Sequence, residues 1–184
     1  MTSPHSVCLY CGSSNAAPPA YLDLARRFGK ATAARGMRLV YGGGGVGLMG
    51  AAAKAANAAG GHVLGIMPRF LARREVVYDD VPHIMVDTMH ERKKLMFDES
   101  DAFVALPGGI GTLEEIVEMM SWRRLELHAK PMVFLSEDDF WAPLFHLIQH
   151  TVDANLTPKP FAESLVSANS IEACFAAIEA RAAA

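Results

Sequence analysis

The feature that most constrains the fold of this chain is an apolar run that leads directly into a glycine-rich turn and then into a helical pattern. The run at 102–106 is short, uncharged and rich in β-prone residues, which is typical of a buried strand. Glycines at 108, 109 and 111 form the turn, and apolar residues then recur at helical spacing between 113 and 120. This segment therefore predicts a strand, a tight turn and a helix in direct succession.

The same alternation of strands and helices runs along the rest of the chain. Nearly every expected strand is continuously apolar, which is the pattern of a parallel sheet covered by helices on both faces. The sequence therefore predicts one doubly wound, mostly parallel α/β domain over residues 1–184. Strands are expected at 6–10, 37–41, 62–66, 83–86, 102–106, 132–135 and 165–167. Helices are expected at 18–36, after the glycine run 42–50 up to 60, from 89, from 112, at 139–152 and from 170, with a short helical turn within 69–80.

The composition argues against several classes of protein. The 184 residues carry a formal net charge of −3 without a long basic block, which argues against a nucleic-acid partner. No apolar stretch is long enough to cross a membrane, and the first residues lack the pattern of a secretory signal. We therefore expect a soluble, cytoplasmic protein.

The cysteine and histidine spacings predict neither a redox pair nor a metal site. Cys8 and Cys11 lie three residues apart at the end of the first strand, so their side chains are expected on opposite faces of the sheet. Reduced, structural cysteines fit a cytoplasmic compartment. His146 and His150 share a helix face, but no third ligand of matching spacing accompanies them, and we expect no metal.

Three loops rich in small residues, at 12–15, 42–50 and 107–112, follow strands of the predicted sheet. Ligands of open parallel sheets bind at the carboxyl ends of the strands, so the three loops could line one crevice. At the turn 107–112, the free N–H groups and the dipole of the helix that follows favour a phosphate. The alternative is a tight connection in which Thr112 caps the helix and Glu115 completes a capping box. The first turn has no G-x-G-x-x-G and the chain has no G-x-x-x-x-G-K-[ST], which disfavours NAD and excludes a P-loop nucleoside triphosphatase.

The helix expected from 89 carries an arginine in its apolar sector. Arg92 is the i+3 neighbour of Met89 and the i−4 neighbour of Met96. A guanidinium on such a face needs an anion, either a ligand phosphate or Glu115 across the crevice. The alternative is that Arg92 extends over the methionines into solvent.

Glu115 lies opposite the apolar stripe of the helix after the turn, so we expect it outside the core. In the first turn the helix dipole favours its ionised form, which suits a base or a stabiliser of positive charge and not a general acid. Met119 and Trp122 share its side of the helix. We expect these two residues in the wall of a pocket or in a subunit contact.

Taken together, the stretches 42–50, 89–93 and 107–115 resemble the Lonely Guy (LOG) family, the cytokinin riboside 5′-monophosphate phosphoribohydrolases, whose members were often labelled lysine decarboxylases. The likeness extends from Cys11 to about Leu144. It implies a Rossmann-like fold, usually a homodimer, and no cofactor. It also implies hydrolysis of the N-glycosidic bond of an adenosine or N6-modified adenosine 5′-monophosphate, which yields the free base and ribose 5-phosphate.

Carried over by position, the resemblance makes Arg92 and Glu115 the catalytic pair. The turn at 109–112 would hold the phosphate, and Lys93 would lie beside Arg92 in the substrate site. The residues implied to contact the substrate are Gly12, Ser13, Gly44, Glu75, Met89, Lys93, Gly108, Gly109, Ile110, Gly111, Thr112, Glu114 and Ser121.

Two other functions remain open from the residues alone. The same loops could serve a non-catalytic module that binds a nucleotide monophosphate. Amino-acid decarboxylation would need a lysine that forms a Schiff base with pyridoxal phosphate. Lys54, Lys93 and Lys94 are available, but none lies in a sequence setting that suggests such a role.

Overall fold

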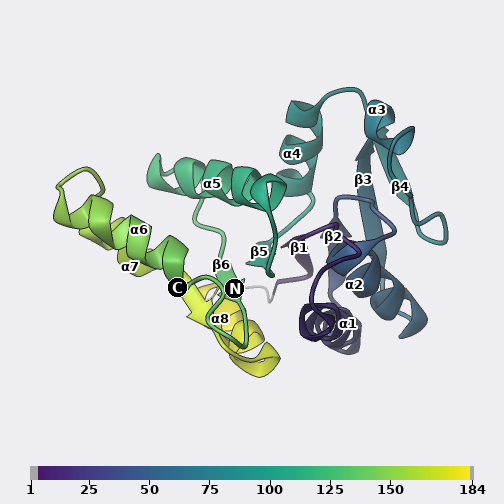
Figure 1. The fold of residues 1–184 in the computed structure, drawn as a ribbon, viewed down its shortest axis with the longest axis horizontal. Helices are drawn as coiled ribbons and strands as arrows, with labels where there is room; N and C mark the ends of the chain where they lie inside the picture. Colours follow the sequence, from purple (N-terminus) through teal and green to yellow (C-terminus); the bar gives the residue numbers. More distant parts are fainter. Residues whose placement is uncertain (1–3, 183–184) are drawn as a thin grey trace.

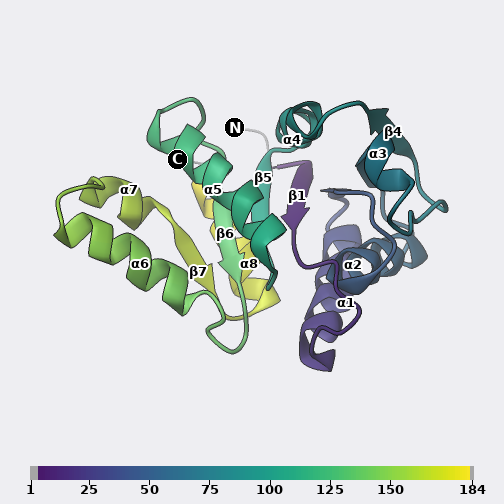
Figure 2. The ribbon, with the colours of Figure 1, turned by 45° about the horizontal axis from the view of Figure 1, so that its top comes forward.

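Seven parallel strands form one sheet in the computed structural model, which describes residues 4–182. Part of the N-terminal segment considered for a secretory signal lies outside these residues. The strand order is β4-β3-β2-β1-β5-β6-β7, and each neighbouring pair is parallel, which confirms the predicted fold class. Figure 1 labels the strands from β4 to β6, and Figure 2 labels β7. The strands are β1 (Ser6–Tyr10), β2 (Arg38–Tyr41), β3 (Val63–Pro68), β4 (His83–Val86), β5 (Ala102–Ala105), β6 (Met132–Leu135) and β7 (Val166–Ala168).

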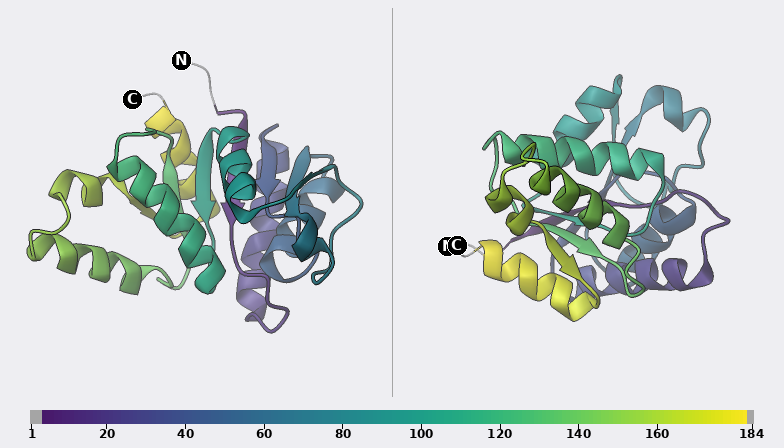
Figure 3. Two further views of the ribbon diagram at one scale, coloured as in Figure 1. Left: turned by 90° about the horizontal axis from the view of Figure 1, so that it is seen from above. Right: turned by 60° about the vertical axis from the view of Figure 1, so that its left-hand side comes forward.

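Helices cover both faces of the sheet, as Figures 2 and 3 show. The core on one face is built with α1, α2 and α8, and the core on the other face with α4, α5, α6 and α7. Among the described helices, none combines the length and hydropathy that crossing a bilayer requires. The helices are α1 (Pro19–Ala34), α2 (Gly47–Ala58), α3 (Arg69–Ala72), α4 (Met89–Asp98), α5 (Ile110–Arg124), α6 (Ala142–Asp153), α7 (Lys159–Ser164) and α8 (Ile171–Ala182).

Alternate residues of β1 contribute to the two cores. Val7 and Leu9 pack with α1, α2 and α8, whereas Cys8 packs on the opposite face. Cys11, just after the strand, belongs to the first of these cores, so Cys8 and Cys11 lie on opposite faces as their spacing predicts. Both are buried and free, and so is Cys174.

The order of the strands places a crevice between β1 and β5. From β1 the chain continues to β2 on one side, and from β5 it continues to β6 on the other side. The loops that leave these two neighbouring strands therefore diverge at their carboxyl ends. Ligands of doubly wound proteins bind at such a switch point.

α5 is oriented only in part as predicted, because Ile116 and Met120 of the predicted apolar stripe are buried but the rest of the prediction is wrong. Its buried residues include Glu115 and Met119, whereas Val117, assigned to the apolar stripe, is 49% exposed. Met119 is fully buried, and so it belongs to the core and not to a pocket wall. A charged residue occupies the buried face because Arg92 of α4 meets it there, which a hydropathy pattern does not detect.

Two smaller features also differ from expectation. The helix predicted from 139 begins at Ala142, and α7 was not predicted. Each helix has a proline in its first turn, where proline is favoured. Asp139 has a positive φ of 58°, so it does not belong to α6. Neither change affects the switch point.

Candidate active site

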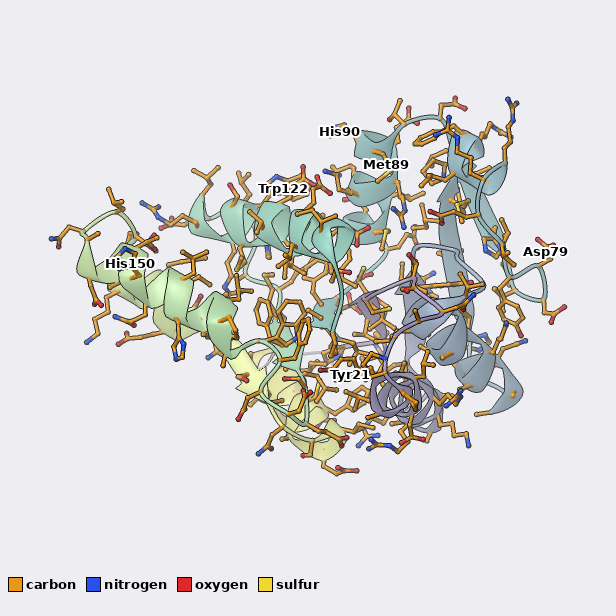
Figure 4. All side chains as sticks on the ribbon, viewed as in Figure 1. Tyr21, Asp79, Met89, His90, Trp122 and His150 are labelled. Carbon is orange, nitrogen blue, oxygen red and sulfur yellow. The ribbon has the colours of Figure 1, made fainter. Side chains whose placement is uncertain are left out.

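A pocket of about 430 Å³ opens at the switch point between β1 and β5. It is lined by the loop after β1, the first turns of α5, the start of α4 and the segment around α3. Met89, labelled at the start of α4 in Figure 4, belongs to this lining. The lining residues are Cys11, Gly12, Ser13, Ser14, Met49, Leu71, Glu75, Met89, Arg92, Gly109, Ile110, Gly111, Thr112 and Glu115.

The Arg92 side chain is buried beneath this pocket and is fixed from several directions. Its Nε donates to the carbonyl of Ile66 and its Nη2 to the carbonyl of Gly42, both at 3.3 Å. Its Nη1 lies 3.3 Å from Oε1 of Glu115, so the carboxylate is its anionic partner in this structure. The alternative that Arg92 extends into solvent is wrong, because only 7% of the residue is exposed.

Glycine at position 42 is what allows this arrangement. A Cβ on Gly42 would overlap Nη2 of Arg92, so any side chain there would displace the guanidinium. The turn after β2 therefore holds the arginine against the sheet edge.

Glu115 is also buried, with 8% of its surface exposed, contrary to the expectation that it lies outside the core. Burial raises the pKa of its carboxyl to about 7, although the Arg92 guanidinium acts in the opposite direction. The expectation that the helix position favours the ionised form did not include this effect of burial. A carboxyl with this pKa can accept and release a proton near neutral pH.

The first turn of α5 presents unused hydrogen-bond donors. The helix begins at Ile110 with Gly109 as its N-cap, and no side chain caps it. Thr112 is therefore the third helical residue, and the alternative in which it caps the helix is wrong. Within residues 4–182, the N–H groups of Ile110, Gly111 and Thr112 have no hydrogen-bond acceptor. Free amides at a helix start in a pocket are suited to an anion such as a phosphate.

The first turn of α2 differs, although its loop contains more glycines. The N–H of Gly47 donates to Oδ1 of Asn15 at 3.1 Å, and the N–H of Leu48 donates to the carbonyl of Gly12 at 2.9 Å. Gly47 has φ +60°, and a Cβ there would overlap the backbone of Ser13. This loop thus packs tightly against the loop after β1 and does not offer these two amides to a ligand.

The structure brings most of the expected site residues together. Of the catalytic and substrate-contacting residues expected, ten line the pocket: Gly12, Ser13, Glu75, Met89, Arg92, Gly109, Ile110, Gly111, Thr112 and Glu115. Five do not: Gly44, Lys93, Gly108, Glu114 and Ser121.

The reasons for these five exceptions are local. Lys93 is buried and donates to Glu114, so the two bind each other beside the pocket. Ser121 is exposed and lies about two turns of α5 beyond Glu114. Gly108 packs against Gly12, and Gly44 lies behind Met49.

Four lining residues were not expected: Cys11, Ser14, Met49 and Leu71. Ser14 and Met49 belong to two of the loops that the sequence singled out. Leu71 lies in the four-residue helix α3, within a charged segment whose sequence shows no periodicity that would place it.

Within the described part of the chain, no group of three or more His, Cys, Asp or Glu residues is arranged to hold a metal ion. His150 lies on α6, far in Figure 4 from Met89, which lines the pocket.

Residues 49–178 match the family model described as "Possible lysine decarboxylase". A protein of rice (Oryza sativa subsp. japonica) named probable cytokinin riboside 5′-monophosphate phosphoribohydrolase LOGL9 is 45% identical over 163 residues, which cover 88% of this chain and 72% of that protein. The cytokinin riboside 5′-monophosphate phosphoribohydrolase LOG2 of Arabidopsis thaliana is 41% identical over 163 residues, with coverage of 88% and 76%.

Solved structures share the fold. The molybdenum cofactor binding protein from the phototrophic bacterium Rippkaea orientalis superimposes with a TM-score of 0.72 at 26% identity and covers 98% of both chains. The molybdenum cofactor carrier protein of Chlamydomonas reinhardtii superimposes with a TM-score of 0.74 at 23% identity over all of both chains, which supports the fold alone.

Proposed function

Because this chain belongs to the family described as possible lysine decarboxylase, and its curated relatives are named cytokinin riboside 5′-monophosphate phosphoribohydrolases, we propose that it is such a hydrolase. Its substrate is an adenosine or N6-modified adenosine 5′-monophosphate, and its products are the free base and ribose 5-phosphate. The observation that carries the proposal is the buried pair of Arg92 and Glu115 in the same pocket as the free amides of α5.

The start of α5 binds the 5′-phosphate in this proposal. The N–H groups of Ile110, Gly111 and Thr112 and the positive end of the helix dipole attract the anion. The phosphate is remote from the bond that breaks, so its binding energy can position the ribose and can be used in the transition state.

Glu115 acts at the sugar. Cleavage of the C1′–N9 bond leaves the electron pair on the base and develops positive charge on the ribose, which an ionised carboxylate stabilises. Water adds to C1′, and Glu115 takes one of its protons. That proton then passes to the departing base, so atoms and charge balance. A pKa of about 7 suits a group that must accept and then release a proton.

Arg92 orients Glu115 and remains protonated throughout, since an arginine does not release its proton near neutral pH. Its hydrogen bonds to the carbonyls of Ile66 and Gly42 fix its position relative to the sheet.

The apolar part of the pocket lining suits the base. The side chains of Met49, Leu71 and Met89 offer apolar surface, and Glu75 supplies a carboxylate in the same lining. Flexible methionines adapt to groups of different shape. We therefore propose that the site accepts both adenine and N6-substituted adenines.

We also propose a homodimer in the cytoplasm. Ile110 and Val117 of α5 and its C-cap residue Leu125 are exposed, which supports a contact with a second copy of the chain. The three free cysteines are compatible with a reducing compartment.

The geometry does not favour a decarboxylase. Lys93 is held by two carboxylates, which keep its amine protonated, and Lys94 pairs with Asp98 on the surface. Lys54 lies in a separate cleft between α1 and α2. A Schiff base needs a neutral amine at the cofactor, and no lysine is among the residues that line the described active-site pocket.

A binding module without catalysis is the second candidate, favoured by the likeness to a molybdenum cofactor binding protein. An assay of base release from AMP and isopentenyladenosine monophosphate separates the two. The proposed hydrolase predicts release by the wild-type protein and loss of release in Glu115→Gln. Tight nucleotide binding without release would instead support the binding module.

A further inference from the structure

A second cluster of charges lies directly beside the pair of Arg92 and Glu115. Lys93 is the next residue of α4, and its ammonium donates to Glu114 and lies 3.0 Å from Oε2 of Glu118. Only 11% of the Lys93 side chain is exposed, against 52% for Glu114 and 24% for Glu118. Lys93, Glu114 and Glu118 are called the flanking cluster below.

The flanking cluster joins the two helices that carry the catalytic pair. Lys93 comes from α4 and both carboxylates from α5. One turn further along each helix, the rings of Phe97 and Trp122 pack edge to face with centroids 5.2 Å apart. The junction of α4 and α5 therefore consists of successive contacts, and the one at the pocket is the pair of Arg92 and Glu115.

None of the three residues of the flanking cluster lines the pocket. The position of Lys93 therefore does not support a direct contact with the substrate. Because its ammonium is buried and already has two carboxylate partners, it can act on the reaction only through the helices or through its charge.

We propose that Lys93 and Glu118 are positioning residues that hold α4 against α5 and keep Arg92 opposite Glu115. This inference rests on the proposed function, because the reaction that it affects is the one proposed above. By fixing α4 against α5, Lys93 and Glu118 maintain the distance of 3.3 Å between the guanidinium of Arg92 and the carboxylate of Glu115.

The charges of the cluster also act on Glu115. From α5, Glu114 and Glu118 raise the pKa of Glu115, and from α4, Arg92 and Lys93 lower it. From β1 and the loop after it, Cys8, Tyr10 and Cys11 also face this carboxyl, but burial raises their own pKa values and keeps them neutral. Glu75 lines the same pocket from the segment after α3.

The test compares Lys93→Met with Glu118→Gln, each in the full chain, by the pH dependence of kcat and by KM. Lys93→Met removes a positive charge, so the acid limb of the profile should move to higher pH by about half a unit or more, and kcat should fall at least about tenfold with little change in KM. Glu118→Gln removes a negative charge and should move the limb to lower pH. Lys93→Arg should restore most of the lost kcat.

Lys94→Met is the matched control, because Lys94 is the next residue of α4 and pairs with Asp98 on the surface. It should leave the profile unchanged. A rise in KM with unchanged kcat in Lys93→Met would overturn the inference in favour of substrate contact. Shifts of the same sign in Lys93→Met and Glu118→Gln would also overturn it.

If the wild-type protein releases no base, the proposed function fails. The inference about Lys93 and Glu118 is then tested by a measurement that needs no enzymatic activity. The carboxyl ¹³C resonance of Glu115 is then titrated in the same variants. Opposite shifts of its pKa in Lys93→Met and Glu118→Gln support the positioning pair, and equal or absent shifts overturn it.

Discussion

Nη1 of Arg92 lies 3.3 Å from Oε1 of Glu115, with 9% and 11% of the two side chains exposed. This separation is about half an ångström longer than the 2.7–2.9 Å that is usual for a charge-assisted hydrogen bond. A buried ion pair is poor evidence for stability, because removing both charges from water costs about as much as their attraction returns. A loose buried pair beneath a pocket is better explained by chemistry that requires it there.

Replacing Glu115 with glutamine should abolish most turnover. The amide keeps the shape of the side chain but cannot accept a proton from water or stabilise positive charge on the ribose, so kcat should fall by about 10² to 10⁴. Release of base from AMP, followed by chromatography, measures the loss. Glu179→Gln, exposed on α8 on the opposite face of the sheet, should retain wild-type activity. Full activity in Glu115→Gln would contradict the proposed role of the carboxylate.

The same carboxyl should make the stability of the protein depend on pH. Burial raises the pKa of Glu115 from its usual 4.5 to about 7, so the folded protein holds this proton at pH values where the unfolded chain has released it. The stabilisation is complete below pH 4.5 and is lost as the pH rises through 7, by roughly 3 kcal/mol.

Urea unfolding between pH 5 and pH 8 measures this effect. The free energy of unfolding should fall more steeply in the wild-type protein than in Glu115→Gln, which has no titrating group at this position. Equal slopes for the two proteins would mean that Glu115 is ionised in the folded state throughout this range.

The strand pattern and the three loops at one sheet edge were predictable from the sequence, because apolar runs and glycine turns are local signals. The burial of Glu115 was not predictable from its own helix. Its carboxyl lies inside because Arg92, more than twenty residues earlier, supplies the partner, and a hydropathy pattern assigns every charged residue to the surface.

The same limit explains the two glycine loops. The sequence predicted that the loop at 42–50 and the turn at 107–112 line the same crevice. Only the tertiary structure shows that Gly12 and Asn15 accept the hydrogen bonds of two amides in the first turn of α2, whereas those of α5 remain free. Long-range pairing of backbone groups leaves no local pattern in a sequence.

Replacing Gly111 with alanine should weaken substrate binding without harming the fold. A Cβ at Gly111 would meet no protein atom, and alanine is the better helix former by up to about 1 kcal/mol. The methyl group would enter the pocket where we place the phosphate, so KM should rise about tenfold or more, because binding is lost in the ground state as in the transition state. Thermal unfolding should show equal or higher stability. An unchanged KM would place the phosphate elsewhere.

Replacing Gly42 with alanine should act on the reaction chiefly through Arg92. The added Cβ would overlap Nη2, so the guanidinium must move from the carbonyl of Gly42 and from Glu115. Because the far end of an arginine can shift without moving the backbone, we expect a folded protein with kcat lowered by about 10 to 100 times.

A double-mutant cycle with Arg92→Met tests this route. If Gly42→Ala acts by displacing the guanidinium, it should have little further effect on kcat in a protein that already lacks Arg92, and the two losses should be strongly non-additive. Additive losses would mean that the turn after β2 affects the reaction independently of Arg92. The cycle thus measures whether a glycine outside the pocket lining determines where the Arg92 guanidinium lies.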